Sequence, residues 1–261
     1  MLIKLIRNDI KSSYRELFPL YMGLLLFAVI AAVSVNPERE WLSVVTVLPF
    51  FALFIATSVI LTLTIIKLFT NRLYSNEGYL TFTLPVTTLQ TFMAKIITAS
   101  IWIILTIAVY ILATSLFAGL WTLLNWNIIE SEFVRFAYIW DKIPWQEIIP
   151  EAIRLFSISI PQTLVGILYA CSMILITVVF VNSSYVSNKK LLIGIIVYLV
   201  LNFIFNNINS NLMTDWLTYT DLHNFEINWL MYGLDLLYFG LISIGLIAGS
   251  VWLNDHKLEL E

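Results

Sequence analysis

The sequence predicts an all-α integral membrane protein with six transmembrane helices. Hydrophobic residues make up 60% of the 261-residue chain and charged residues only 12%, whereas soluble domains average about 25% charged residues. The charges are clustered, and they leave six long intervals without any charged side chain. A helix of about 20 apolar residues crosses a bilayer core, and these intervals lack the alternating polarity of a transmembrane β-strand.

The six expected spans are the intervals between charged residues. Each interval contains at least 19 residues. Lipid offers no partners for backbone N–H and C=O groups, so a spanning segment must satisfy them internally, as a helix does. The intervals are Leu17–Pro37, Trp41–Ile66, Ile96–Ile129, Leu155–Asn188, Leu191–Thr214 and Leu236–Asn254, and the last extends backwards through Trp229–Leu234.

Residues 1–17 predict an N-terminal amphipathic helix before the first span. Apolar side chains recur every three or four residues, which is the period of one helix face. Basic side chains occupy the other positions, and a basic amphipathic helix lies in the membrane interface. A solvated lead-in to the first span is the alternative. Because Lys4–Glu16 is rich in charge, we expect no cleavable signal peptide. The apolar residues are Ile3, Ile6, Ile10, Tyr14 and Leu17, and the basic ones are Lys4, Arg7, Lys11 and Arg15.

The distribution of Lys and Arg predicts the orientation of the spans. Short loops that are rich in Lys and Arg stay on the cytoplasmic side. With the N-terminus inside, ten of the 14 Lys and Arg residues are cytoplasmic and four are outside. We therefore expect a multi-pass protein of the plasma (cytoplasmic) membrane, with both termini, Thr70–Gln90 and Ser183–Lys190 in the cytoplasm. The four outer residues are Arg39, Arg135, Lys142 and Arg154.

Two outer segments have unusual compositions. Asn125–Ser157 mixes aromatic and acidic residues, and we expect short amphipathic helices at the outer interface, where aromatic rings are enriched. Asn206–Asn228 is rich in Asn and closely follows the fifth span. A lid or re-entrant segment is one interpretation of both, and an ordinary surface loop with interfacial aromatics is the other.

The sequence lacks the motifs of the common catalytic and metal sites. It has no G-x-x-x-x-G-K-[ST] phosphate loop and no G-x-S-x-G nucleophile motif, and neither His223 nor His256 belongs to a set with metal-ligand spacing. The net charge of −3 argues against the basic face of a nucleic-acid binder. The single Cys171 lies in an apolar run, which predicts a small buried side chain. We expect that the chain is not itself an enzyme and binds no cofactor, metal or nucleic acid.

Polar residues within the spans are candidates for a translocation pathway. Asp235 is the one acidic residue inside an apolar run, and intramembrane charges are usually functional, whereas a position at the outer interface is the alternative. For the amides, hydrogen bonding between helices is the alternative to a place in the pathway. Lys67 and Lys95 lie at span ends, so we expect their ammonium groups to reach the headgroups. At Gly166 we expect a bulkier residue to disturb helix packing. The candidate pathway residues are Gln162, Asn202, Asn206 and Asp235.

The stretch between the second and third spans, Thr70–Gln90, is the most distinctive polar segment. An amphipathic run leads to Pro85, which cannot continue a helix interior. Thr87 or Thr88 can cap a new helix after it. We expect a short structured segment on the cytoplasmic membrane surface, where a soluble partner can bind.

This segment also carries a resemblance to a known family. It reads R-L-Y-x-x-E-G-Y-L-T-F-T-L-P-V-T from Arg72 to Thr87. Together with the basic N-terminal helix and the six spans, it resembles the membrane (permease) subunit of bacterial type 2 ATP-binding-cassette exporters, which often have Lys at the position of Lys95. The resemblance covers essentially the whole chain, as one transmembrane permease domain over residues 1–261, and the segment is its most specific part.

The resemblance implies that another subunit supplies the energy. In this family the segment between the second and third spans is a coupling helix that docks in a cleft of a separate cytoplasmic ATPase, which binds ATP and Mg²⁺. Two permease chains, identical or similar, and two ATPase chains form the working unit in the membrane. The expected function is ATP-driven export of an amphipathic or hydrophobic substrate, such as a peptide, a lipid or a drug. The implied ATPase contacts are Arg72, Tyr74, Glu77, Gly78, Tyr79, Leu80 and Phe82.

Two other classes of function are alternatives. A non-transporting membrane immunity or sensor protein requires no motif, so the sequence does not exclude it. A secondary transporter would show inverted repeats and broken helices, and we find no convincing internal repeat. A neighbouring gene for an ATPase with a phosphate loop would favour the permease.

Overall fold

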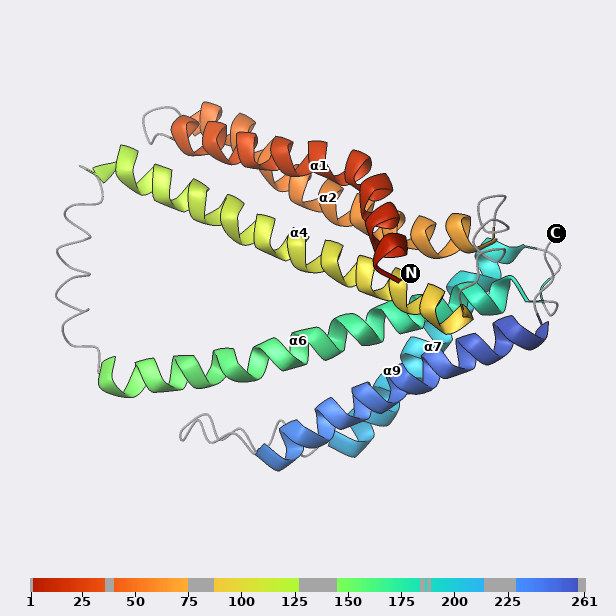
Figure 1. Ribbon diagram of the computed structural model, residues 1–261. Coiled ribbons are helices and arrows are strands. Elements are labelled where there is room, and N and C mark those ends of the chain that lie inside the picture. The colour runs from red at the N-terminus through yellow and green to blue at the C-terminus, as the bar shows by residue number, and fades with distance from the viewer. Residues whose placement is uncertain are drawn as a thin grey trace. The chain divides into compact units, whose positions relative to one another are not determined.

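The computed structural model describes residues 2–35, 40–74, 87–126, 145–183, 186, 189–213 and 229–257 of the chain. The regular structure of these residues consists of six long α-helices (Figure 1). They are α1 (Leu2–Ser34), α2 (Glu40–Tyr74), α4 (Thr88–Leu124), α6 (Trp145–Val181), α7 (Lys190–Met213) and α9 (Trp229–Lys257).

All six helices are long and apolar enough to cross a membrane. The prediction of an all-α protein with six candidate spans is therefore confirmed. By length and composition, the spanning parts are Leu2–Ser34, Val44–Thr70, Thr88–Leu124, Phe156–Val181, Lys190–Asn209 and Tyr232–His256.

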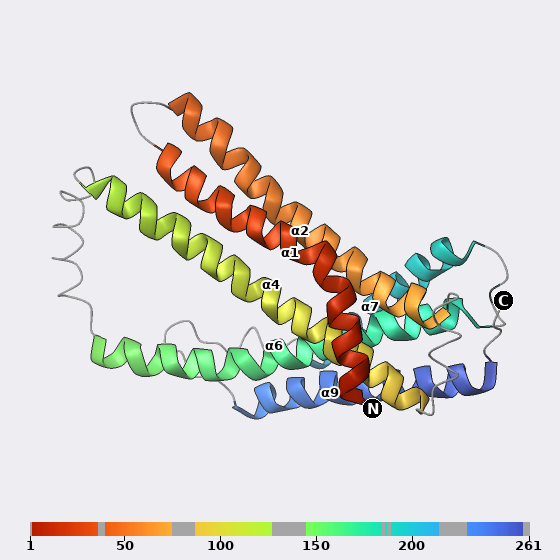
Figure 2. The same cartoon turned by 45° about the horizontal axis from the view of Figure 1, so that its top comes forward.

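The basic N-terminal residues and the first span belong to one helix. The amphipathic helix expected over residues 1–17 is the first part of α1, which starts at Leu2 and continues to Ser34. Pro19 lies inside α1, where a proline removes one backbone hydrogen bond and favours a kink. The α1 ribbon is bent in both views (Figure 2). That the N-terminal part lies in the membrane interface stays a prediction.

Other helices also extend past the charged residues that delimit the expected spans. The helix α4 begins at Thr88 rather than at Ile96. Residues 145–157 of the expected outer segment belong to α6, and Asn206–Asn209 belong to the span of α7. A charged residue limits the apolar core of a span, but it does not end the helix, because its long side chain can reach polar surroundings. The remainder of both outer segments, residues 127–144 and 214–228, lies outside the described residues.

The chain groups into two compact units. Four helices, α1, α2, α4 and α6, have residues in both units. Unit 1 contains Met1–Arg7, Ile66–Ser100 and Phe156–Glu261. Unit 2 contains Asn8–Ile65 and Ile101–Leu155. Unit 1 therefore includes the end of α2, the start of α4, most of α6, and all of α7 and α9. Unit 2 includes most of α1, most of α2 and the rest of α4.

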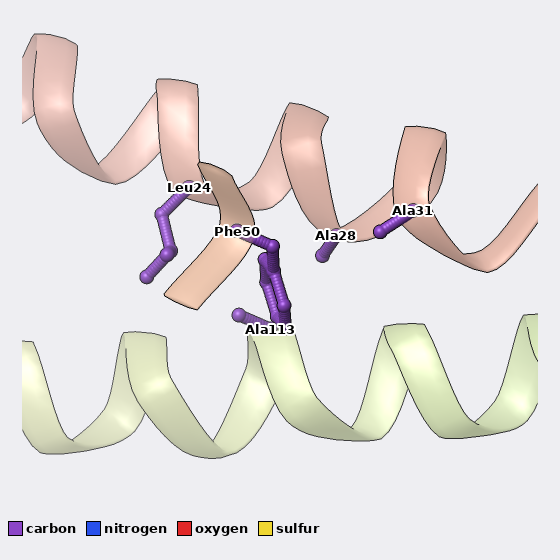
Figure 3. Close-up of a cluster of buried hydrophobic side chains, with 5 residues drawn as sticks. All are labelled: Leu24, Ala28, Ala31, Phe50 and Ala113. Atoms are coloured by element: carbon purple, nitrogen blue, oxygen red, sulfur yellow. The ribbon is translucent and has the colours of Figure 1, made fainter. Parts of the chain in front are cut away.

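Unit 2 has a core in which small residues of one helix meet a large aromatic ring of the next. Figure 3 shows Phe50 of α2 lying between α1 and α4, beside Ala113. Leu24, Ala28 and Ala31 of α1 complete the cluster, and all five side chains are buried. Small residues at a helix–helix contact allow close packing, which is the main attraction between helices in lipid.

Polar side chains add hydrogen bonds between the helices of unit 2. The hydroxyl groups of Tyr21 on α1 and Thr106 on α4 are 2.6 Å apart. Thr64 on α2 donates to Glu16 Oε2 on α1 over 3.1 Å. Hydrogen bonds of this kind contribute to helix association in a membrane, where isolated polar groups find few partners.

Unit 1 has its own buried core and its own hydrogen bonds. The helix α7 packs against α9, and the hydroxyl of Tyr232 on α9 donates to the Ile158 carbonyl on α6 over 2.6 Å. Cys171 is a buried free thiol, as predicted. The fully buried large side chains of this unit include Phe69, Phe92, Ile96, Met173, Leu175 and Val179.

Large apolar side chains cover the surface of α7. Leu191, Leu199 and Phe203 are 79%, 59% and 70% exposed. A soluble protein rarely exposes so large an apolar surface, whereas hydrocarbon solvates it without penalty. These side chains are therefore consistent with direct contact between α7 and lipid.

Two expectations about single residues are wrong. Lys95 is only 5% exposed, so its ammonium group is enclosed by protein and does not reach out to headgroups. Gly166 has open space around the position that a Cβ atom would occupy, so it does not mark a close helix contact. Among the glycines that the structure describes, the tightest is Gly194 on α7, where a Cβ would lie 3.3 Å from Val181 Cγ2 on α6.

We predict that Gly194→Leu destabilises the protein, because the added side chain would collide with Val181. Overpacking of this kind typically costs about 1–3 kcal/mol. The measurement is the unfolding temperature of the purified protein in detergent. Gly166→Leu is the matched control, since no atom outside its own stretch of helix backbone lies within 4 Å of its Cβ position. Equal unfolding temperatures for the two variants would contradict the assignment of Gly194 to the packed contact.

Candidate functional site

The predicted coupling segment, Thr70–Gln90, is described at its two ends. The helix α2 ends at Tyr74 and α4 begins at Thr88. Arg72 belongs to the last turn of α2, but the structure does not describe its side chain. The remaining predicted contacts also lie outside the described residues, so their role stays a prediction: Glu77, Gly78, Tyr79, Leu80 and Phe82.

Thr87 fixes the start of α4. The Gln90 backbone N–H donates to Thr87 Oγ1 over 3.3 Å, and the Thr91 N–H donates to the Thr87 carbonyl over 3.1 Å. This is the geometry of an N-cap, in which a side-chain oxygen satisfies a backbone donor in the first helical turn. Of the two predicted caps, the structure selects Thr87.

Both ends of the segment are bonded to the C-terminal end of α9. The Tyr74 hydroxyl donates to Asn254 Oδ1 over 3.1 Å, and the Thr88 hydroxyl donates to Asp255 Oδ1 over 2.7 Å. We call these four residues the loop base. All four belong to unit 1, and both views show the end of α2, the start of α4 and the end of α9 at the same end of that unit (Figures 1 and 2).

The two hydrogen bonds of the loop base differ in environment. Asn254 is only 7% exposed, and burial raises the pKa of Tyr74 above its ordinary value. The Tyr74 hydroxyl therefore stays protonated at neutral pH and acts as a donor. The bond from Thr88 to Asp255 is exposed, but its acceptor is a carboxylate, and hydrogen bonds to charged groups are the stronger class.

Buried apolar side chains lie close to the loop base along α2 and α4. Leu68 and Phe69, one to two turns before Tyr74, are 2% and 0% exposed. Phe92 and Ile96, one and two turns after Thr88, are 0% and 1% exposed. These buried side chains anchor both helix ends in the packed core of unit 1.

Two pairs of polar residues in unit 1 include three of the four predicted pathway residues. Asn206 Nδ2 donates to Asn202 Oδ1 one turn earlier on α7. The carboxyl group of Asp235 on α9 lies within hydrogen-bonding reach of the Asn209 side chain on α7. The Asn209 Oδ1 atom itself is buried and has no hydrogen-bond partner. Asp235 is thus inside the candidate span of α9, close to its start at Tyr232.

Gln162 belongs to neither pair. It lies on α6 with an exposed side chain, and no hydrogen bond among the described residues joins it to Asn202, Asn206 or Asp235. Tyr238 also joins α9 to α7, because its hydroxyl donates to the Phe205 carbonyl over 2.9 Å.

Sequence reasoning missed the α9 half of the loop base. Asn254 and Asp255 terminate the last apolar interval, which made them look like ordinary span-end residues. Their partners lie 180 and 167 positions away in the sequence, and no local pattern reports such a separation. A polar pair next to a span end is the only signal that was available.

Among the described residues, no group of three or more His, Cys, Asp or Glu side chains could hold a metal ion. Comparison of the chain with protein-family models, with curated proteins and with solved structures finds no match. The loop base is therefore the feature of the described residues that bears most on function.

Proposed function

We propose that this chain is the permease subunit of an ATP-driven exporter and that a separate ATPase engages it at the segment between α2 and α4. In this proposal the chain lines the pathway of an amphipathic or hydrophobic substrate in the plasma membrane. It works with a second permease chain, identical or similar, and with two ATPase subunits that bind ATP and Mg²⁺. Both termini and the segment lie in the cytoplasm.

The observation that supports this proposal most is the loop base. A soluble ATPase can drive membrane helices only through a mechanical contact, and a contact transmits force only if its attachment points are fixed. The segment meets this requirement, because Tyr74 and Thr88 fix its two ends to neighbouring residues of α9. A loop that merely connects two spans needs no such attachment.

The polar residues on α7 and α9 are compatible with a pathway. Asn202, Asn206 and Asp235 lie within candidate spans, where polar side chains are costly and usually functional. Gln162 on α6 is the fourth candidate, and its exposed side chain is available to a substrate or to a second permease chain. We keep all four as proposed pathway residues.

The proposed orientation predicts which side of the membrane reaches Ser75. In a variant without Cys171, a cysteine at Ser75 should react with an impermeant maleimide only after the membrane has been opened. A cysteine at Asn36, between α1 and α2, should react in intact cells and serves as the control. Labelling of position 75 from outside intact cells would contradict the orientation.

The proposed contact predicts that Glu77→Ala and Tyr79→Ala weaken association with the ATPase. Aromatic anchors at protein interfaces often cost about 2 kcal/mol or more when truncated, which is roughly a thirtyfold loss of affinity. Abundance in the membrane should stay near normal, because the sequence places both residues in the polar stretch between the second and third spans. The measurement is the amount of ATPase that co-purifies with each variant.

Leu199→Ala is the control for this experiment. Leu199 is 59% exposed on α7, so its truncation should leave association unchanged. If the Glu77 and Tyr79 variants retain the ATPase as well as the Leu199 variant does, the segment is not the docking site and the permease proposal loses its main support.

A further inference from the structure

We propose that α9 is a transmission element, which carries a movement of the coupling segment to the polar contacts of α6 and α7, and that Asn254 and Asp255 are the positioning residues through which it does so. This inference rests on the proposed function. It goes further, because a segment between α2 and α4 is covalently tied only to those two helices, whereas the loop base adds α9, which is remote in sequence.

The C-terminal end of α9 reaches two neighbouring helices. Successive residues of an α-helix point in directions about 100° apart. Asn254 and Asp255 are adjacent on α9, so one of them reaches Tyr74 on α2 and the other reaches Thr88 on α4. A displacement of either end of the segment therefore acts on the same turn of α9.

The N-terminal half of α9 is bonded to α6 and α7. At Tyr232 it is bonded to the Ile158 carbonyl of α6. At Tyr238 it is bonded to the Phe205 carbonyl of α7, and Asp235 between them reaches the side chain of Asn209. The helix is thus bonded to the segment at one end and to two other spans at the opposite end.

One continuous helix connects these two sets of contacts. The rise of 1.5 Å per residue puts Tyr238 and Asn254 about 24 Å apart along α9. The helix is continuous from Trp229 to Lys257, so the two sets of contacts lie on one unbroken element. A shift at Asn254 and Asp255 is therefore delivered to Asp235 and Tyr238, within the proposed pathway.

The test uses variants that remove only the hydroxyl groups of the loop base. Tyr74→Phe and Thr88→Val keep the shape of each side chain and delete its donor. Thr114→Val is the matched control, because the Thr114 hydroxyl bonds only to carbonyl groups of its own helix, at Tyr110 and Ile111. Each protein is purified as the complex with its ATPase, and hydrogen exchange is measured with and without Mg²⁺ and the non-hydrolysable analogue AMP-PNP.

In the wild-type complex we expect AMP-PNP to change amide exchange both in residues 75–86 and in α9 around Tyr232–Tyr238. In the doubly substituted complex the change in residues 75–86 should persist, while the change in α9 should be largely lost, because both hydrogen bonds of the loop base are removed. The Thr114→Val complex should behave as the wild type does.

A change in α9 that keeps its wild-type size in the doubly substituted complex would overturn the role of the loop base and leave the proposed function intact. A wild-type complex that shows no nucleotide-dependent change in residues 75–86 would overturn both. The two failures are therefore distinguishable in one data set.

Discussion

Most of this structure follows from the inability of hydrocarbon to form hydrogen bonds. A backbone group that is unsatisfied in lipid costs several kcal/mol (about the cost of moving an amide into an apolar medium), so the described chain folds into long helices that satisfy their own backbone. Once the backbone is satisfied, helices associate by close packing and by hydrogen bonds between polar side chains. The pairs Tyr21–Thr106, Thr64–Glu16 and Tyr232–Ile158 all act in this way. The loop base applies the same principle at the end of the spans.

The loop base gives a physical form to the idea of coupling. Two hydroxyl groups, on Tyr74 and Thr88, bind adjacent residues of a third helix. The segment between them is thereby attached to α9 as well as to α2 and α4. In the proposed exporter, a push from the ATPase would move α9 together with these helices, and α9 is bonded to α6 and α7 near Asp235.

The sequence predicts the spans well, but it does not predict the contacts between helices that are remote in sequence. Composition alone predicts six helices, because lipid permits few alternatives. The helix ends were harder, since charged residues do not end helices: Glu16 and Lys95 both lie inside one. Thr87 was a correct capping candidate because a cap is local in sequence. Asn254 and Asp255 were missed because their partners are remote, and the burial of Lys95 and the open surroundings of Gly166 depend on packing that one sequence does not encode locally.

The central claim is that residues 75–86 bind an ATPase, and site-specific photo-crosslinking tests it most directly. A photoreactive amino acid replaces Tyr79 in one variant and Leu199, on the exposed surface of α7, in another, and the cross-linked products are identified by mass spectrometry. The account predicts that position 79 captures a polypeptide with a G-x-x-x-x-G-K-[ST] phosphate loop and that position 199 does not. Capture of lipid alone at position 79, in cells where the protein is abundant and correctly inserted, would contradict it.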